Sequence, residues 1–131
     1  MSESPDAFVY RATLDRVVDG DTLDCTLDLG FDVFLNKQRV RLAGIDTPES
    51  RTRNLQEKAL GLKAKDRLIE LCEGTFKVKS LGKGKYGRIL GIPYTADGKD
   101  ICQKLIDEGH AVEYWGGTKT GKILEDGTWG E

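Results

Sequence analysis

Three short segments of the chain combine carboxylate and guanidinium side chains, and these groups bind hard cations and phosphate oxygens, respectively. The segments read Asp19-Gly20-Asp21-Thr22, Arg41-Leu42-Ala43-Gly44-Ile45-Asp46-Thr47-Pro48-Glu49 and Gly84-Lys85-Tyr86-Gly87-Arg88. Each segment alone has an ordinary explanation, because Asp-Gly is a common turn pair, Thr-Pro often ends a strand and Tyr-Gly-Arg fits a surface loop. Their combination in one chain indicates a site for metal and phosphate chemistry.

Alternating side chains predict that strands position the first two segments. From residue 22 to residue 29, apolar side chains alternate with threonine and aspartate, the period-two pattern of a half-buried strand. Residues 8–18 predict the preceding strand, joined to this one by the Asp-Gly turn. A third strand covers about residues 37–45 and ends before Pro48, because proline cannot donate a hydrogen bond to a sheet. The segments therefore fall where strands end.

A helix is expected to follow the second segment. Asn54 and Glu57 stand three residues apart, the spacing at which a capping side chain and a carboxylate that reaches back satisfy free amides at a helix start. Leucine and alanine then recur at helical spacing as far as residue 71. Gly74 is the expected end of the helix.

The remaining elements complete a recognisable order. Residues 75–80 and 88–94 predict two further strands, and residues 100–109 predict a short second helix. Residues 117–131 show no clear period, and we expect them to form a partly mobile tail. Three strands, a helix, two strands and a helix predict a five-stranded antiparallel β-barrel of the OB-fold type, with one helix inserted after the third strand and a short second helix.

Composition excludes several classes of protein. The 131 residues suffice for one domain, and 38% hydrophobic with 32% charged side chains are typical of a globular protein. No apolar run is long enough for a membrane helix, and the first residues lack the pattern of a signal peptide. Three cysteines, Cys25, Cys72 and Cys102, are too widely spaced for a zinc clip. We therefore expect reduced cysteines, a cytoplasmic location and no membrane partner.

The net charge of -2 conceals an uneven distribution. Residues 33–90 carry 14 basic and 6 acidic side chains, whereas both flanking stretches are acidic. A basic central block can attract an anionic ligand, although such blocks can also scatter over a folded surface. The low sequence pI of about 5.5 indicates either weak, salt-sensitive binding of a polyanion or a preference for short or single-stranded substrates.

In their order along the chain, the three segments resemble the signature of the staphylococcal nuclease-like (thermonuclease) family. That signature reads Asp-Gly-Asp-Thr, then Arg-x-x-x-x-Asp-Thr-Pro-Glu, then Lys-Tyr-Gly-Arg, and the resemblance runs from about Tyr10 to Lys119. It implies an OB-fold and a sugar-nonspecific, calcium-dependent phosphodiesterase that cuts DNA and RNA and leaves 3′-phosphate ends. We expect a flexible N-terminus over residues 1–7, the nuclease-like domain over residues 8–119 and a tail over residues 120–131.

The resemblance also implies a metal site. Asp21 and Asp46 would bind Ca²⁺ through carboxylate oxygens, and Thr47 would bind it through its backbone carbonyl. Calcium accepts oxygen ligands and tolerates water in its coordination shell. Two carboxylates and a carbonyl can therefore be the ligands that the protein supplies, with water completing the shell. Asp19 is expected to shape the turn rather than to bind the metal.

The resemblance further assigns the residues of catalysis. Arg41 and Arg88 would hold the scissile phosphate, because planar guanidinium groups bind two of its oxygens at once. Glu49 would orient or deprotonate the attacking water. In this sequence, Gly84 stands where the family commonly has an acidic residue, a difference that concerns the loop geometry and not the catalytic set.

Five further residues are candidates for nucleic-acid binding: Lys83, Lys85, Tyr86, Tyr114 and Trp115. The lysines can contact phosphates or merely keep a loop soluble, and Tyr86 can contact a nucleotide or pack beside the loop. Tyr114 and Trp115 offer rings on which a base can stack, and the sequence does not choose between them.

Two other functions stay open at this point. The chain could be a catalytically silent OB-type module that binds nucleic acid or a protein, or a calcium-binding structural domain. The silent module does not require both arginines, both aspartates and Glu49, all of which are present. We predict a nuclease acting on DNA and RNA, with Ca²⁺ as cofactor, single-stranded substrates favoured and a monomeric state.

Overall fold

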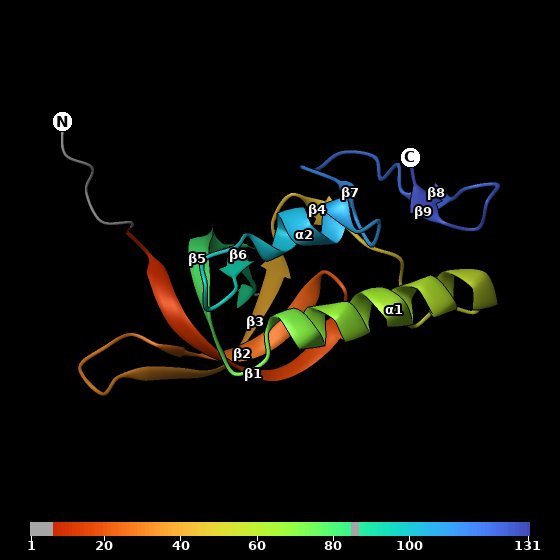
Figure 1. Ribbon diagram of the computed structural model, residues 1–131. Helices are drawn as coiled ribbons and strands as arrows, with labels where there is room; N and C mark the ends of the chain where they lie inside the picture. The colour runs from red at the N-terminus through yellow and green to blue at the C-terminus, as the bar shows by residue number, and fades with distance from the viewer. Residues whose placement is uncertain (1–6, 85–86) are drawn as a thin grey trace.

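The computed structural model describes residues 7–84 and 87–131, and five of its strands close into a barrel (Figure 1). The barrel strands are β1 (Val9–Asp19), β2 (Thr22–Asp28), β3 (Phe34–Leu42), β5 (Thr75–Lys83) and β6 (Ile89–Tyr94). They are hydrogen-bonded in the order β1-β2-β3-β6-β5. The predicted OB-type barrel is therefore confirmed. Residues 1–6 of the segment predicted to be flexible lie outside the described residues.

One pairing departs from the prediction of an entirely antiparallel barrel. Neighbouring strands are antiparallel throughout, except that β3 and β6 run parallel, with Val40 opposite Ile89 and Leu42 opposite Gly91. The physical reason is topological. Strand directions cannot alternate all the way around a closed ring of five, because five is odd, so one neighbouring pair must be parallel.

The barrel interior is filled by the apolar sides of its strands. The side chains that are fully buried there include Leu23, Cys25, Val40, Phe76 and Val78. On β2, buried and half-buried positions alternate from Leu23 onward as the sequence predicted, and Thr22 before them is also buried. All three cysteines are free and buried, in agreement with the predicted reduced state, and burial raises the pKa of each thiol to about 12.

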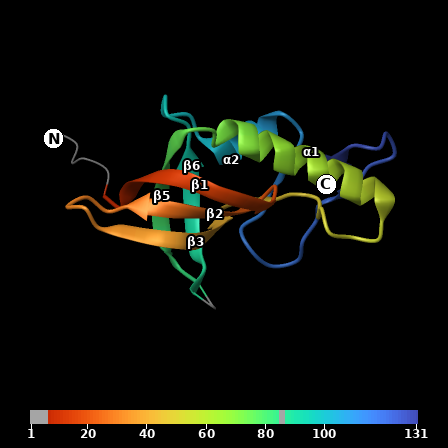
Figure 2. The same ribbon diagram turned by 90° about the horizontal axis from the view of Figure 1, so that it is seen from below.

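Two helices cover the outside of the barrel. Helix α1 (Leu55–Leu71) lies along the β1 side, and α2 (Ile101–Asp107) packs against both β6 and α1 (Figure 2). Asp100 caps α2 by accepting a hydrogen bond from the Gln103 amide, as predicted. Neither helix in the described part of the chain is long and apolar enough to cross a membrane.

The start of α1 confirms only half of the predicted capping arrangement. The side chain of Asn54 accepts hydrogen bonds from the amides of Gln56 and Glu57, so it caps the helix. The Glu57 carboxylate, however, does not reach back to the amide of Asn54, which donates to the Thr52 hydroxyl instead. Glu57 accepts a hydrogen bond from a residue outside the helix, as described below.

Four short strands escaped the sequence analysis. β4 (Ile45–Asp46) pairs with β7 (Val112–Glu113), and β8 (Lys122–Ile123) pairs with β9 (Trp129–Gly130). A two-residue strand is too short to show a period of two. The β8–β9 hairpin occupies the segment for which we expected a partly mobile tail, and it lies beside the start of α1 (Figures 1 and 2).

The ion pair between the helices generates a pH-dependent prediction. Arg67 on α1 donates two hydrogen bonds to Glu108 at the end of α2, at 2.7 and 2.9 Å, and this pairing lowers the pKa of Glu108. A carboxylate whose pKa is lower in the folded state than in the unfolded state stabilises the fold at neutral pH. This contribution disappears as the pH falls through the folded-state pKa. Glu108→Gln should therefore lower the free energy of unfolding by about 0.5–1 kcal/mol at neutral pH, a modest loss because the pair is partly exposed. In acid, where Glu108 is protonated in both states, the substitution should leave the free energy of unfolding unchanged.

Urea denaturation of both proteins at neutral pH and at a pH below the lowered pKa of Glu108 measures this difference. Glu73→Gln, which removes an exposed carboxylate just after α1, serves as the matched control. An equal loss for Glu108→Gln at both pH values would contradict the role of the ion pair.

Candidate active site

Strand pairing gathers the predicted site residues at one end of the barrel. Asp21 lies in the turn between β1 and β2, and its carbonyl accepts a hydrogen bond from the Leu42 amide at 2.8 Å. The register that pairs Thr22 with Arg41 sets the end of β3 beside this turn. The parallel register that pairs Arg41 with Leu90 brings the start of β6 to the same place.

All six predicted metal and catalytic residues line one pocket of about 160 Å³. They are Asp21, Arg41, Asp46, Thr47, Glu49 and Arg88, and the same pocket is also lined by Asp19, Thr22, Pro48 and Lys119. The structure therefore brings together six predicted residues that lie up to 67 positions apart in the sequence, from Asp21 to Arg88. Nearly all of the lining is polar, as a site for ions and phosphate requires.

Asp21 and Asp46 form the acidic side of the pocket, and both are buried. The Asp21 carboxylate accepts hydrogen bonds from the Thr22 hydroxyl at 3.0 Å and from the Thr47 amide at 3.3 Å. Burial raises the pKa of Asp46, nearby Lys119 opposes that rise, and the negative charge of Asp21 adds to it. Two carboxylates that repel each other in a buried place favour a cation beside them.

The donor set at this place fits a hard divalent cation. Within the described residues, no three or more His, Cys, Asp or Glu side chains converge as metal ligands, so a cation would have to draw part of its shell from carbonyls and water. Calcium accepts such a shell. The hydroxyl of Thr47, the residue after Asp46, is buried without a hydrogen-bond partner, and the Thr47 amide donates to the Asp21 carboxylate.

Arg41 is held in place by backbone carbonyls at the strand ends. Its guanidinium donates to the carbonyls of Leu42 at 2.8 Å and Ile45 at 2.9 Å, and it lies 3.4 Å from the Asp21 carboxylate. Its side chain is only 19% exposed. A guanidinium fixed in this way keeps its orientation without a bound substrate, which suits recognition of a planar pair of phosphate oxygens.

Glu49 extends from a loop whose neighbouring residues are buried. Pro48 and Ser50 are buried, whereas Glu49 is exposed and lines the pocket. The Ser50 amide donates to the Asp19 carboxylate at 3.2 Å, and the Ser50 hydroxyl makes a second hydrogen bond to it. Asp19 therefore ties the loop to the end of β1, consistent with the expectation that it shapes the turn.

The candidates for nucleic-acid binding fall into three groups. Lys83 ends β5 with an exposed side chain, opposite Ile89 at the start of β6. Lys85 and Tyr86 lie outside the described residues. Tyr114 and Trp115 both line a second pocket, of about 220 Å³, together with Arg41, Leu42, Gly44, Ile45, Leu90 and Gly116.

The indole of Trp115 lies directly on Gly44, which is why no side chain fits there. A Cβ added at Gly44 would come within 2.4 Å of the ring. Gly44 also adopts a φ of +77°, a conformation that favours glycine. Trp115 is 68% exposed and lines the second pocket, so its ring is accessible to a ligand there.

Lys119 is a site residue that the sequence analysis missed. Its ammonium lies 3.6 Å from the Asp46 carboxylate and 5.9 Å from the centre of the Tyr114 ring. It follows a glycine pair in a segment without regular period, so no sequence signal distinguishes it from an ordinary surface lysine. Only the return of the chain past β4 brings it to the pocket.

The β8–β9 hairpin supplies further residues that no motif indicated. Trp129 donates from its indole nitrogen to the Asp46 carbonyl at 3.2 Å, and Gly121 lies so close that an added Cβ would meet both the Trp129 ring and the Asp46 carboxylate. A third pocket, of about 340 Å³, opens between this hairpin and the start of α1. It adjoins the first through four shared residues: Asp46, Thr47, Glu49 and Lys119.

Comparison of the sequence with known proteins identifies nuclease relatives. Residues 39–125 match the family model described as staphylococcal nuclease homologue. Endonuclease YhcR of Bacillus subtilis (strain 168) is 32% identical over 115 residues, which are 81% of this chain and 9% of that protein. The SPbeta prophage-derived endonuclease YokF of the same strain is 38% identical over 103 residues, covering 76% of this chain and 32% of that protein. Micrococcal nuclease of Shigella flexneri is 38% identical over 91 residues, covering 65% of this chain and 42% of that protein.

The chain thus spans less than half the length of these relatives. The matched region contains the second and third segments, whereas the Asp19–Thr22 turn precedes it. What joins that turn to the site in this chain is the strand register described above.

Close packing of α1 on the site generates a second prediction. A Cβ at Gly20 would lie 2.6 Å from the Ala64 Cβ and 3.0 Å from the Thr47 hydroxyl, so Gly20→Ala should destabilise the fold by about 1–3 kcal/mol. Gly84→Ala is the control, since its Cβ would lie 3.7 Å from the Arg88 carbonyl oxygen, an ordinary contact. Thermal unfolding of both variants measures the difference in stability. An unchanged melting temperature for Gly20→Ala would contradict the close approach of Ala64 to Gly20.

Proposed function

The chain belongs to the staphylococcal nuclease family, and we propose that it is a calcium-dependent nuclease that hydrolyses phosphodiester bonds of DNA and RNA. The observation that carries this proposal is the convergence of Asp21, Asp46, Arg41, Arg88 and Glu49 on one polar pocket. A phosphate bound there would meet the fixed guanidinium of Arg41, the guanidinium of Arg88 and the exposed carboxylate of Glu49. That arrangement is what hydrolysis of a phosphodiester requires.

The two arginines would bind the equatorial oxygens of the scissile phosphate. Negative charge grows on these oxygens during attack, so donors that are already oriented stabilise the transition state more than the ground state. Arg41 meets that condition because carbonyls hold its guanidinium. Arg88 lines the same pocket from the start of β6.

Glu49 would act as the general base. It would take a proton from water while the water oxygen forms a bond to phosphorus and the bond from phosphorus to the 5′-oxygen breaks. The 5′-oxygen leaves with the bonding electrons and takes up a proton, which gives a 5′-hydroxyl and a 3′-phosphate end. Asp21, Asp46 and the Thr47 carbonyl would hold Ca²⁺, which supplies Lewis-acid polarisation of the phosphate when bound.

The second pocket would hold a base next to the bound phosphate. It shares Arg41 with the catalytic pocket, and its mainly apolar lining includes Tyr114 and Trp115. An exposed indole face suits an unpaired base, because a base must leave its stack before it can lie on a side chain. We therefore propose a preference for single-stranded substrates, with Lys83, Lys85 and Tyr86 as further contacts to the strand. One chain contributes the entire site, so a monomer suffices.

Cleavage assays with single-stranded DNA, double-stranded DNA and RNA, in calcium, magnesium and chelator, test the proposal. Wild-type protein should cleave in calcium only, and Glu49→Gln should lower kcat by a factor of roughly 10²–10⁴, the usual contribution of a general base, while substrate still binds. Full turnover by Glu49→Gln would remove Glu49 from the mechanism. Binding without cleavage by the wild-type protein would favour the silent OB-type module instead.

Calcium binding is tested apart from activity. Asp46→Asn should weaken Ca²⁺ binding by roughly tenfold or more, because a carboxylate ligand becomes a neutral amide. Isothermal titration calorimetry of the protein without nucleic acid measures this, and Asp66→Asn, which alters an exposed carboxylate on α1, is the control. An unchanged Kd for Asp46→Asn would refute the metal site.

A further inference from the structure

Glu57 uses its carboxylate outside its own helix. It stands in the first turn of α1, where an acidic side chain usually reaches back to the cap or faces the free amides. Here its Oε2 accepts a hydrogen bond from the backbone amide of Glu49 at 3.0 Å. Asn54 caps the helix through its side chain. The carboxylate of Glu57 instead binds the loop that carries Glu49.

One turn further along α1, Gly61 touches the same stretch of backbone. A Cβ at Gly61 would lie 2.5 Å from the carbonyl carbon and oxygen of Glu49 and 2.7 Å from the amide nitrogen of Ser50. Residues four apart share one face of a helix, so the hydrogen-bond acceptor of Glu57 and the bare backbone of Gly61 lie side by side on α1. Asp19 holds Ser50 from the strand side.

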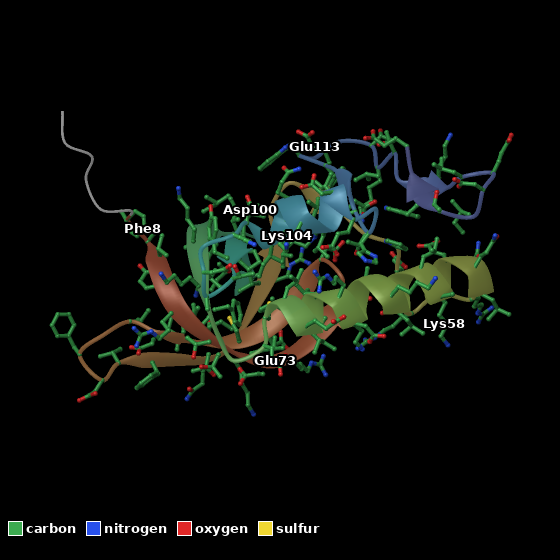
Figure 3. All side chains as sticks on the ribbon, in the orientation of Figure 1. Phe8, Lys58, Glu73, Asp100, Lys104 and Glu113 are labelled. Atoms are coloured by element: carbon green, nitrogen blue, oxygen red, sulfur yellow. The ribbon has the colours of Figure 1, made fainter. Side chains whose placement is uncertain are left out.

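These contacts fix the backbone of Glu49 at its amide, at its carbonyl and through the following residue. Only the side chain remains free, and it is exposed in the pocket that also contains Arg41 and Arg88. The outer face of α1, where Figure 3 labels Lys58, is exposed and turned away from the β8–β9 hairpin. The helix therefore has one face directed to solvent and another that holds the Glu49 loop.

We propose that Glu57 is a positioning residue for Glu49, fixing the general base by binding its backbone amide; this inference rests on the proposed nuclease function. The loop between β4 and α1 has no helix or strand hydrogen bonds of its own to hold Glu49. A general base must stay within hydrogen-bond reach of the water that it deprotonates, and a displacement of about 1 Å can cost a hundredfold in rate. Glu57 supplies the missing partner.

Two substitutions at Glu57 separate positioning from chemistry. Glu57→Ala removes the acceptor, so kcat on single-stranded DNA should fall roughly ten- to hundredfold, while KM stays within about twofold because the arginines and aromatic rings are untouched. Glu57→Gln keeps a carbonyl oxygen that can accept the same hydrogen bond, so it should restore kcat to within about threefold of wild type. Asp66→Ala removes an exposed carboxylate from the same helix and is the matched control.

Amide hydrogen exchange at Glu49, followed by NMR, tests the contact without relying on catalysis. The amide should be protected in the wild type and in Glu57→Gln, and it should exchange faster in Glu57→Ala while core amides stay protected. The core amides show that the variant is folded. If the wild type cleaves nothing, the proposed function fails, and the exchange data alone decide whether Glu57 holds the loop.

Three results would overturn the proposal. Wild-type kcat in Glu57→Ala would show that the contact does not position the base. A loss in Glu57→Gln as deep as in Glu49→Gln would show that Glu57 takes part in proton transfer itself. An exchange rate at Glu49 that is the same in all three proteins would show that the hydrogen bond does not hold the amide in solution.

Discussion

Closure of a barrel from an odd number of strands is the constraint on which the rest of the structure depends. Because five strands cannot alternate in direction around a ring, one neighbouring pair must run parallel, and in this barrel the pair is β3 and β6. The end of β3 lies beside the start of β6 in this parallel pair, which brings Arg41 and Arg88 to the same pocket. The antiparallel register of β2 with β3 then sets the Asp21 turn against the end of β3. The polar pocket is thus a consequence of barrel closure and not of any local folding preference.

Helix α1 fixes the site from outside the barrel by approaching it closely at glycine positions. Gly20 leaves room for the Ala64 methyl group, and Gly61 lets the helix touch the backbone of Glu49. Such contacts are rigid, because interiors pack with few voids and a side chain at either position would force the backbone apart. The helix therefore connects the core of the barrel to the loop that carries Glu49, and Glu57 adds a polar contact to this packing.

Much of the fold was predictable from local patterns. Period-two alternation located β2, helical spacing located α1, and the order of elements indicated the OB-type barrel, since each pattern reflects a face that must be buried. The parallel pair, the two-residue strands and the β8–β9 hairpin were not predictable. A two-residue strand has no period, and its existence depends on a partner far away in the chain: β4 pairs with β7 across more than sixty residues.

By itself, the sequence determined which chemical groups the site contains, because the three segments supply the carboxylates and guanidinium groups and the order of those segments identifies the family. Only the tertiary structure decided how these groups are arranged and what holds them. It sets Lys119 beside Asp46 and the carboxylate of Glu57 on the amide of Glu49. Neither contact has a local signal, because a lysine in an irregular segment and a glutamate in a first helical turn are ordinary features. Their roles arise from which segments the closed barrel brings together.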